Sequence, residues 1–170
     1  MKKSILHFSK SLKGFYILIL FALSATHAFA QLDDLHYLPP LKQNNYSLDA
    51  NRGIRTHKIY ISTPETSAFN VNVYRGTSNT VYATLSVSKS TPVTWSLSGG
   101  TNGDNGITLI PCSAAGIVQS NAGLRFESAG GKKFYVNYRG VSGNQGSLLV
   151  SKGRAALGKN FTWGGVPNTI

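Results

Sequence analysis

The stretch from Leu124 to Tyr138, LRFESAGGKKFYVNY, constrains the fold more than any other part of the sequence. Apolar and polar side chains alternate on both sides of a central Gly-Gly pair. Because successive side chains of a strand point to opposite faces, each half has one apolar face and one polar face. Two such runs around glycines predict a β-hairpin, since glycine readily adopts the positive φ of tight turns. We expect this hairpin to be core scaffold with four side chains packed inward: Phe126, Phe134, Val136 and Tyr138.

Other short runs after Thr56 alternate in the same way, and turn residues separate them. No window of about 12 residues or more after the first 30 residues has helical periodicity. This pattern predicts an all-β fold, a β-sandwich-like domain of short antiparallel strands over residues 56–170. One expected inward face consists of Val81, Ala83, Leu85 and Val87.

Residues 31–55 contain the sequence Leu38-Pro39-Pro40-Leu41. Proline fixes its own φ and biases the preceding residue away from helix, so this part of the chain must be extended. We expect an irregular, extended lead-in that covers a sheet edge or serves as a linker.

The first 30 residues have the pattern of a secretory signal peptide. Four lysines stand in the first 13 residues, and an apolar run follows. Ala28-Phe29-Ala30 has the small-x-small pattern that places cleavage after Ala30. The apolar core is short for a membrane helix, which needs about 20 residues. We therefore expect cleavage rather than an uncleaved anchor, with no membrane span in the mature chain and a secreted, extracellular or cell-surface location.

The chain is basic, with 17 Lys and Arg residues against 6 Asp and Glu residues. Without the four leader lysines, 13 basic and 6 acidic residues remain, a formal charge of +7. Such a charge favours anionic partners such as acidic glycans. The cations are scattered rather than gathered in a stripe, which favours a solvated surface. Nucleic acid is not an expected partner.

No pattern of residues points to catalysis. After the leader, the potential metal ligands of the zinc type are His36, His57 and the single cysteine Cys112. A structural zinc site normally takes four such ligands, so we expect no metal and no cofactor, and we expect Cys112 to be a half-buried small hydrophobe. Ser86 and Lys89 match Ser-x-x-Lys, but on a strand they face opposite sides. The acids are few and dispersed. We predict that the protein is not an enzyme.

Basic and aromatic side chains near the Gly-Gly turn indicate a contact surface. Exposed aromatic rings on a sheet can stack on sugars or anchor an interface, whereas the alternative is a second packed face. The expected partners are cell-surface glycans or host glycoproteins. The candidate binding residues are Lys132, Lys133, Tyr135, Arg139, Trp95 and Trp163.

A series of short motifs runs through the chain in a fixed order: HYLPPL (36–41), IYISTPE (59–65), FNVNVYRG (69–76), GLRFESAGGKKFYVNYRG (123–140), SKGRAALG (151–158) and FTWGGVPN (161–168). This series resembles the N-terminal region of large secreted, gliding-motility-associated and adhesin-like surface proteins of Bacteroidota, a region similar to the N-terminal domain of IgG Fc-binding protein. The resemblance implies an exported, non-enzymatic adhesion or interaction domain at the start of a larger adhesin, and it supplies no catalytic residues.

Other interpretations stay open beside the adhesion domain. The chain could be a carbohydrate-binding module or a small polysaccharide-acting protein with Trp95 or Trp163 as the sugar platform. It could also be an incomplete fragment with no autonomous function. A strand left unpaired at a sheet edge, such as Phe69 to Tyr74, would recruit another copy or another domain. The sequence leaves the oligomeric state undetermined.

Overall fold

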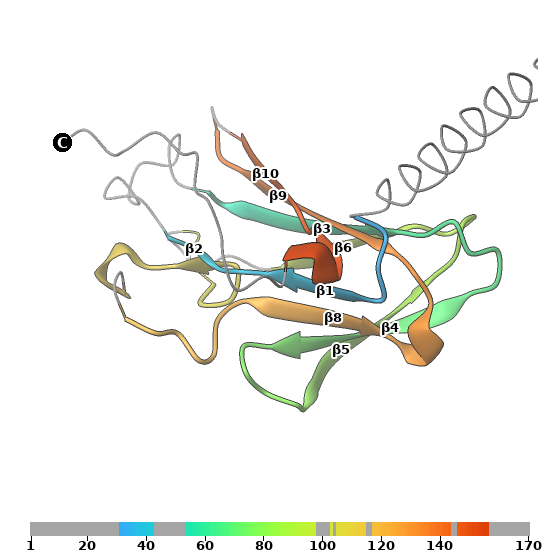
Figure 1. The fold of residues 1–170 in the computed structure, drawn as a ribbon. Coiled ribbons are helices and arrows are strands. Elements are labelled where there is room, and N and C mark those ends of the chain that lie inside the picture. Colours follow the sequence, from blue (N-terminus) through green and yellow to red (C-terminus); the bar gives the residue numbers. More distant parts are fainter. Residues whose placement is uncertain are drawn as a thin grey trace, which may run out of the picture. The chain divides into compact units, whose positions relative to one another are not determined.

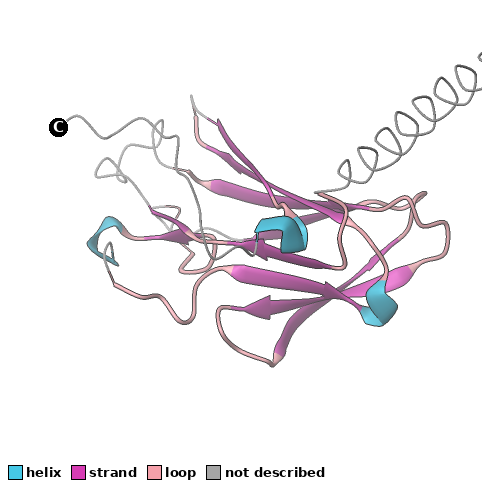
Figure 2. Ribbon diagram, viewed as in Figure 1, coloured by secondary structure: helices cyan, strands magenta, loops and turns pink. Residues whose placement is uncertain are grey.

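The computed structural model describes residues 31–42, 54–97, 103, 105–114, 117–143 and 146–156. The expected leader and Trp163 lie outside the described residues. Figure 2 shows that strands dominate the described chain and that its helices are single 3-10 turns. The predicted all-β class is confirmed.

The described strands follow the chain in this order: β1 (Leu35–Leu38), β2 (Leu41–Lys42), β3 (Thr56–Ser62), β4 (Phe69–Arg75), β5 (Val81–Val87), β6 (Val93–Leu97), β7 (Leu109–Ile110), β8 (Leu124–Ser128), β9 (Tyr135–Val141) and β10 (Gly146–Val150). The 3-10 helices are η2 (Cys112–Ala114), η3 (Ala129–Gly131) and η4 (Gly153–Ala156).

Eight of these strands form two antiparallel sheets, ordered β1-β8-β4-β5 and β10-β9-β3-β6. β2 and β7 form a short parallel pair. The two larger sheets lie as two layers in Figure 1, and one cluster of buried side chains draws on both of them. The architecture is therefore a β-sandwich, as the strand pattern predicts.

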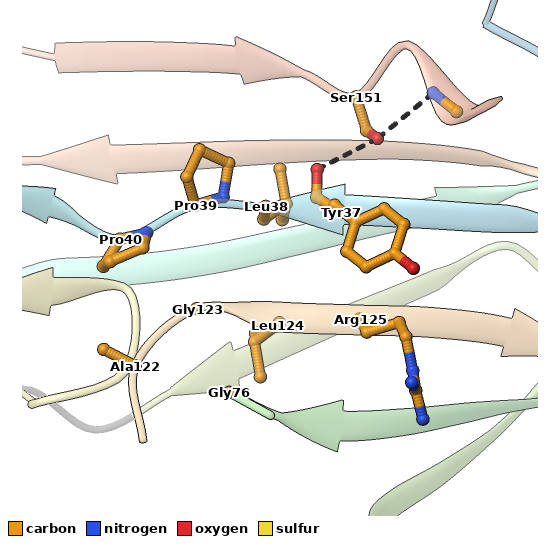
Figure 3. A pocket seen from close by; sticks show the side chains of 11 residues that line it. Tyr37, Leu38, Pro39, Pro40, Gly76, Ala122, Gly123, Leu124, Arg125 and Ser151 are labelled. Carbon is orange, nitrogen blue, oxygen red and sulfur yellow. Dashed lines mark hydrogen bonds between the residues drawn. The ribbon is translucent and has the colours of Figure 1, made fainter. Parts of the chain in front are cut away.

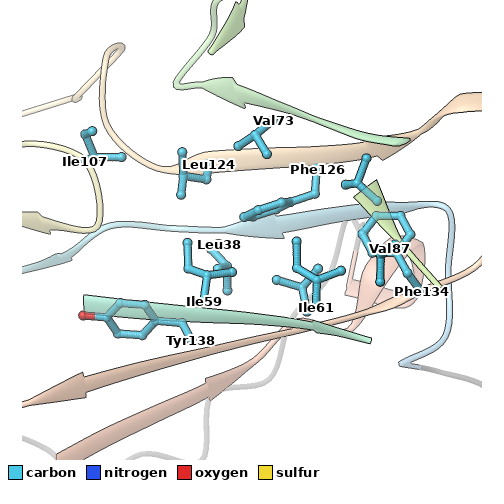
Figure 4. Packing of buried hydrophobic residues seen from close by; sticks show 12 residues of the cluster. Leu38, Ile59, Ile61, Val73, Val87, Ile107, Leu124, Phe126, Phe134 and Tyr138 are labelled. Atoms are coloured by element: carbon cyan, nitrogen blue, oxygen red, sulfur yellow. The ribbon is translucent and has the colours of Figure 1, made fainter. Parts of the chain in front are cut away.

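Side chains that alternate along the strands fill the space between the two layers (Figure 4). Ile59 on β3, Val73 on β4 and Phe126 on β8 have no exposed surface. Burying a side chain of this kind contributes about 1.5–3 kcal/mol. The prediction of four inward side chains is confirmed, because all are at most 1% exposed: Phe126, Phe134, Val136 and Tyr138.

The connection from β8 to β9 is not a hairpin, so that prediction is wrong. β8 pairs with β1 and β4, whereas β9 pairs with β10 and β3 in the facing sheet. Residues 129–134 cross between the layers, and Phe134 is fully buried in this crossing. Alternation does not distinguish the two cases, because each strand buries one face in both. Facing sheets lie about 10 Å apart and paired strands about 4.8 Å apart, so a crossing needs a longer connection than a hairpin does.

The segment expected to be an irregular lead-in supplies a strand of the sandwich. β1 pairs with β8 from Leu35 opposite Glu127 to Leu38 opposite Leu124. The expectation of irregular structure is therefore wrong for Leu35–Leu38. The sequence pattern gives little indication of this strand, because β1 is only four residues long and its partner lies far along the chain.

A β-bulge shifts the pairing of β4 with β5. Tyr74 pairs with Val81, and Tyr82 has no counterpart on β4. The shift turns Val81 to the outer face, where it is 44% exposed, so its expected inward place is wrong. The Tyr82 ring lies 6.0 Å from the Trp95 ring on β6. β4 itself lies inside its sheet, so the idea that Phe69 to Tyr74 is an unpaired edge is also wrong.

His36 on β1 is fully buried and hydrogen-bonded at both ring nitrogens. Its Nε2 donates to the Phe134 carbonyl at 2.8 Å and lies 3.2 Å from the Asp33 carbonyl. Carbonyls only accept, so Nδ1 is the unprotonated nitrogen and accepts from the Ser151 hydroxyl at 3.0 Å. These bonds connect β1 with the chain beside β9 and β10. Burial lowers the pKa of His36, because desolvation disfavours the charged ring.

His57 on β3, in the facing sheet, has a similar arrangement of hydrogen bonds. Its Nε2 donates to the Gly103 carbonyl at 2.7 Å, and Nδ1 lies 2.9 Å from the Tyr138 hydroxyl and 3.2 Å from that of Thr108. Burial lowers the pKa of His57 and raises the pKa of Tyr138 to about 12. His36, His57 and Tyr138 are therefore uncharged side chains of the core near pH 7.

Two glycine substitutions should separate backbone strain from lack of space. Gly76 and Gly130 have φ values of 55° and 74°. A Cβ at Gly76 would collide with the Ser120 carbonyl, whereas nothing lies within 4 Å of one at Gly130. We expect Gly130→Ala to lower the free energy of unfolding by about 1 kcal/mol and Gly76→Ala by about 3 kcal/mol or more. Denaturant unfolding of residues 31–170 measures both, and equal losses would contradict the close contact at Gly76.

The unsubstituted domain is the control for this pair. One core joins both sheets, so we expect a single cooperative transition that different probes report alike. Non-cooperative unfolding would support the alternative of an incomplete fragment.

The free energy of unfolding should fall as the pH drops below about 6.5, the ordinary pKa of histidine. The folded-state pKa values of His36 and His57 are both lowered, so the unfolded state binds more protons in this range. The histidine contribution is fully present above pH 6.5 and is lost as the pH falls toward the folded-state values. Each histidine adds at most about 1.4 kcal/mol per pH unit to the slope. Denaturant unfolding at a series of pH values between about 7.5 and 5 measures this slope.

Single His36→Gln and His57→Gln variants are the controls, and each should have a shallower slope than the unsubstituted domain. Asp34 does not interfere with this measurement. Hydrogen bonding by Arg154 lowers the pKa of Asp34, so its contribution to the free energy of unfolding is lost only below its ordinary pKa of 3.8. A stability that does not change over the histidine range would rule out this role for both rings.

Candidate functional site

The structure brings together only part of the predicted binding surface. Tyr135 and Arg139 share the outer face of β9, because they alternate with buried side chains. Lys132 and Lys133 precede β9 in the crossing from η3, and both are exposed. The Lys132 ammonium forms an ion pair with the Glu65 carboxylate at 3.1 Å. Tyr135 and Arg139 therefore share one face of β9, and one of the two lysines that precede the strand already has an acidic partner.

The structure places Trp95 away from that face. It pairs with Ile59, which has no exposed surface, so Trp95 points to the core side of its sheet. Its ring is partly buried against the core and contacts Tyr82. This position fits the alternative of packing better than a sugar platform. Trp163 lies outside the described residues.

The outer face of the β10-β9-β3 strands combines cationic, aromatic and aliphatic groups. Arg139 lies between Lys58 on β3 and Leu148 on β10 in the register of the sheet, and Asn137 lies between Tyr60 and Val150. Leu148 is 66% exposed. We call this surface the basic sheet face, and its residues are Lys58, Tyr60, Tyr135, Asn137, Arg139, Leu148 and Val150.

Two cations of the basic sheet face lie on directly paired positions. Like charges placed opposite each other on neighbouring strands destabilise a sheet unless another charge compensates them. Neither Lys58 nor Arg139 forms an ion pair within the described part of the chain. The carboxylates of the described residues lie elsewhere: Asp33 and Asp34 are beside Arg154, Glu65 is beside Lys132, and Glu127 is on the other sheet.

A groove of about 390 Å³ lies beside β1 and β8 (Figure 3). Tyr37 stands in it, 41% exposed, and pairs with Arg125 across the two strands. The Arg125 guanidinium lies 4.2 Å from the centre of the Tyr74 ring and donates to the Asn79 side chain at 3.2 Å. Apolar side chains and glycine form most of the remaining lining: Leu38, Pro39, Pro40, Gly76, Ala122, Gly123 and Leu124.

Sequence reasoning missed Lys58 and Leu148 of the basic sheet face, and Tyr37 and Arg125 of the groove. Lys58 and Leu148 become neighbours of Arg139 only through strand pairing, which no local pattern reveals. Tyr37 carries a weak local signal, because an aromatic residue followed by Leu-Pro-Pro is typical of a segment that stays extended at the surface.

Within the ranges that the structure describes, no three His, Cys, Asp or Glu side chains are close enough to hold a metal ion. Ser86 and Lys89 are both exposed, on β5 and in the turn after it. Cys112 is partly buried, as expected. No helix among the described residues is long and apolar enough to cross a membrane.

The arrangement is therefore that of a surface able to bind through charge and stacking, with a groove on the other sheet. Comparison of the chain with protein-family models, with curated proteins and with solved structures finds no match.

Proposed function

We propose that this chain is an exported, non-catalytic interaction domain that binds acidic glycans through the basic sheet face. The observation that carries the proposal is the cross-strand pair of Lys58 and Arg139, which has no carboxylate partner among the described residues. A carboxylate or sulfate group between the two cations would relieve their repulsion and form charge-assisted hydrogen bonds.

The neighbouring groups suit the rest of a glycan chain. Tyr60 and Tyr135 are partly exposed beside the cations, and an aromatic ring can pack against the apolar face of a sugar. A long, open sheet face also suits a polymer better than a small molecule, which needs an enclosing pocket. The expected place of the domain at the start of a larger adhesin agrees with this proposal and stays a prediction.

Replacing both cations should weaken the binding of an acidic polysaccharide. We expect Lys58→Gln combined with Arg139→Gln to raise the Kd for heparin about tenfold or more for each lost charged contact. Binding by the unsubstituted protein should weaken steeply with ionic strength, because exposed charges are screened. Calorimetric titration with heparin and with alginate, against neutral dextran, measures the effect.

The matched control is Lys42→Gln combined with Lys89→Gln, two exposed positions outside the basic sheet face. Both double variants remove the same total charge, so long-range attraction falls equally in the two proteins. Equal loss of heparin binding in both would show non-specific attraction and would refute the proposed site.

A carbohydrate-binding module is the second candidate function, and the groove beside Tyr37 is the observation that favours it. A sugar ring stacked on Tyr37 would bind without a charge partner. We expect Tyr37→Ala to weaken the binding of a neutral glycan about tenfold, with little dependence on salt. A panel of immobilised neutral glycans measures this, with Tyr82→Ala as the control, because Tyr82 is 47% exposed and lies outside both the groove and the basic sheet face. Unchanged binding in Tyr37→Ala would remove the groove from consideration.

A further inference from the structure

Each four-stranded sheet has two edge strands, and three of the four edges are protected. Edge strands expose unpaired main-chain groups, and proteins block them with covering segments, bulges and prolines. η4 lies against β1, and the Ser151 hydroxyl lies 3.1 Å from the Tyr37 carbonyl. β5 carries the bulge at Tyr82. β6 begins directly after Pro92, and its Trp95 ring contacts the Tyr82 ring on β5 of the facing sheet.

β10 is the edge that lacks these devices. Its sequence, GSLLV, contains no charged residue and no proline. It pairs with β9 over all five positions without a bulge, and it has no other strand partner in the described chain. Figure 1 shows β10 at the margin of its layer. Leu148 and Val150 are 66% and 37% exposed.

We infer that β10 pairs antiparallel with β10 of a second copy of this chain, about a two-fold axis at Leu148. Leu148 is the central residue of the five, so this register places it opposite its own copy and Gly146 opposite Val150. The pairing satisfies the open main-chain groups and covers the most exposed apolar side chain of the strand. A strand without charges meets no repulsion from an identical strand, whereas a charged peptide would find no complement there.

The cations of the two copies do not prevent this pairing. In the joined sheet, three inter-strand steps separate Arg139 from its copy, because the row runs from Arg139 through the two Leu148 positions. At about 4.8 Å per step this is about 14 Å, longer than the screening length of about 8 Å at physiological salt. Salt should therefore leave the association unchanged or strengthen it.

The pairing would also join the two basic sheet faces into one surface. It rests on the edge of β10 and does not depend on the proposed function, so either can fail without the other.

The test is the association state of the full chain, purified from an expressing host, in the absence of any glycan. A five-residue edge makes a small interface, so the dimer belongs to the weak class and needs a concentration series that reaches about 1 mM. Sedimentation equilibrium should show a monomer–dimer transition. Leu148→Lys should weaken dimerisation about tenfold or more, because like charges then lie opposite each other.

Val81→Lys is the matched control, since it puts the same charge at an exposed valine on β5 of the other sheet. It should dimerise like the unsubstituted protein. Purely monomeric behaviour of the unsubstituted chain, or an equal effect of the two lysine variants, would overturn the inference.

Disulfide trapping tests the register separately. Opposed positions of an antiparallel pair have Cα atoms about 4.5–5.5 Å apart, within the range of a disulfide. In a Cys112→Ser background, Leu148→Cys should give a disulfide-linked dimer under mild oxidation, and Val81→Cys should stay monomeric. Equal cross-linking at both positions would argue against the pairing at β10.

Discussion

The hydrogen bonds of His36 are the interaction on which most of the described structure depends. The ring sits on β1 of one sheet, and its partners lie just before β9 and just after β10 of the other. Three features therefore meet at one side chain: the crossing at Phe134, the end of β10, and the strand that completes the β1-β8-β4-β5 sheet. A buried carbonyl that loses its donor costs about 1–3 kcal/mol, so the ring helps to fix the relative position of the two layers. The same contacts bring Ser151 beside Tyr37 and so shape one side of the groove.

The sequence revealed the faces of the strands better than their partners. Alternation identified the buried side of β8 and β9 correctly, because burial of one face is a local property of a strand. The same alternation could not distinguish a hairpin from a crossing, since both bury the same side chains. Phe134 favours the crossing over a hairpin, because its ring fills the space between the layers and contacts the His36 ring at a centroid separation of 4.8 Å. That contact joins distant parts of the chain and has no local signature.

In the candidate site, too, the sequence predicts which residues share a face of one strand but not which strands are neighbours. Tyr135 and Arg139 could be placed on one face because they are four positions apart on one strand, an even number. Lys58 and Leu148 could not be added to them without the strand order β10-β9-β3. Trp95 follows the same rule. Alternation places its side chain on one face of β6 with those of Val93 and Leu97, and the pairing of Trp95 with Ile59 shows that this face meets the core.

The position of β1 also has a kinetic consequence. Its partners in β8 and at Ser151 lie far along the chain, and Ser151 is 115 residues from His36. Contacts between residues so distant in sequence form late, because a large loop must close first. The strand that leaves the ribosome first among those described must therefore wait for the end of the sandwich to be synthesised. A chain with this order of events stays open while it is still growing, so its folded core forms only near the end of synthesis.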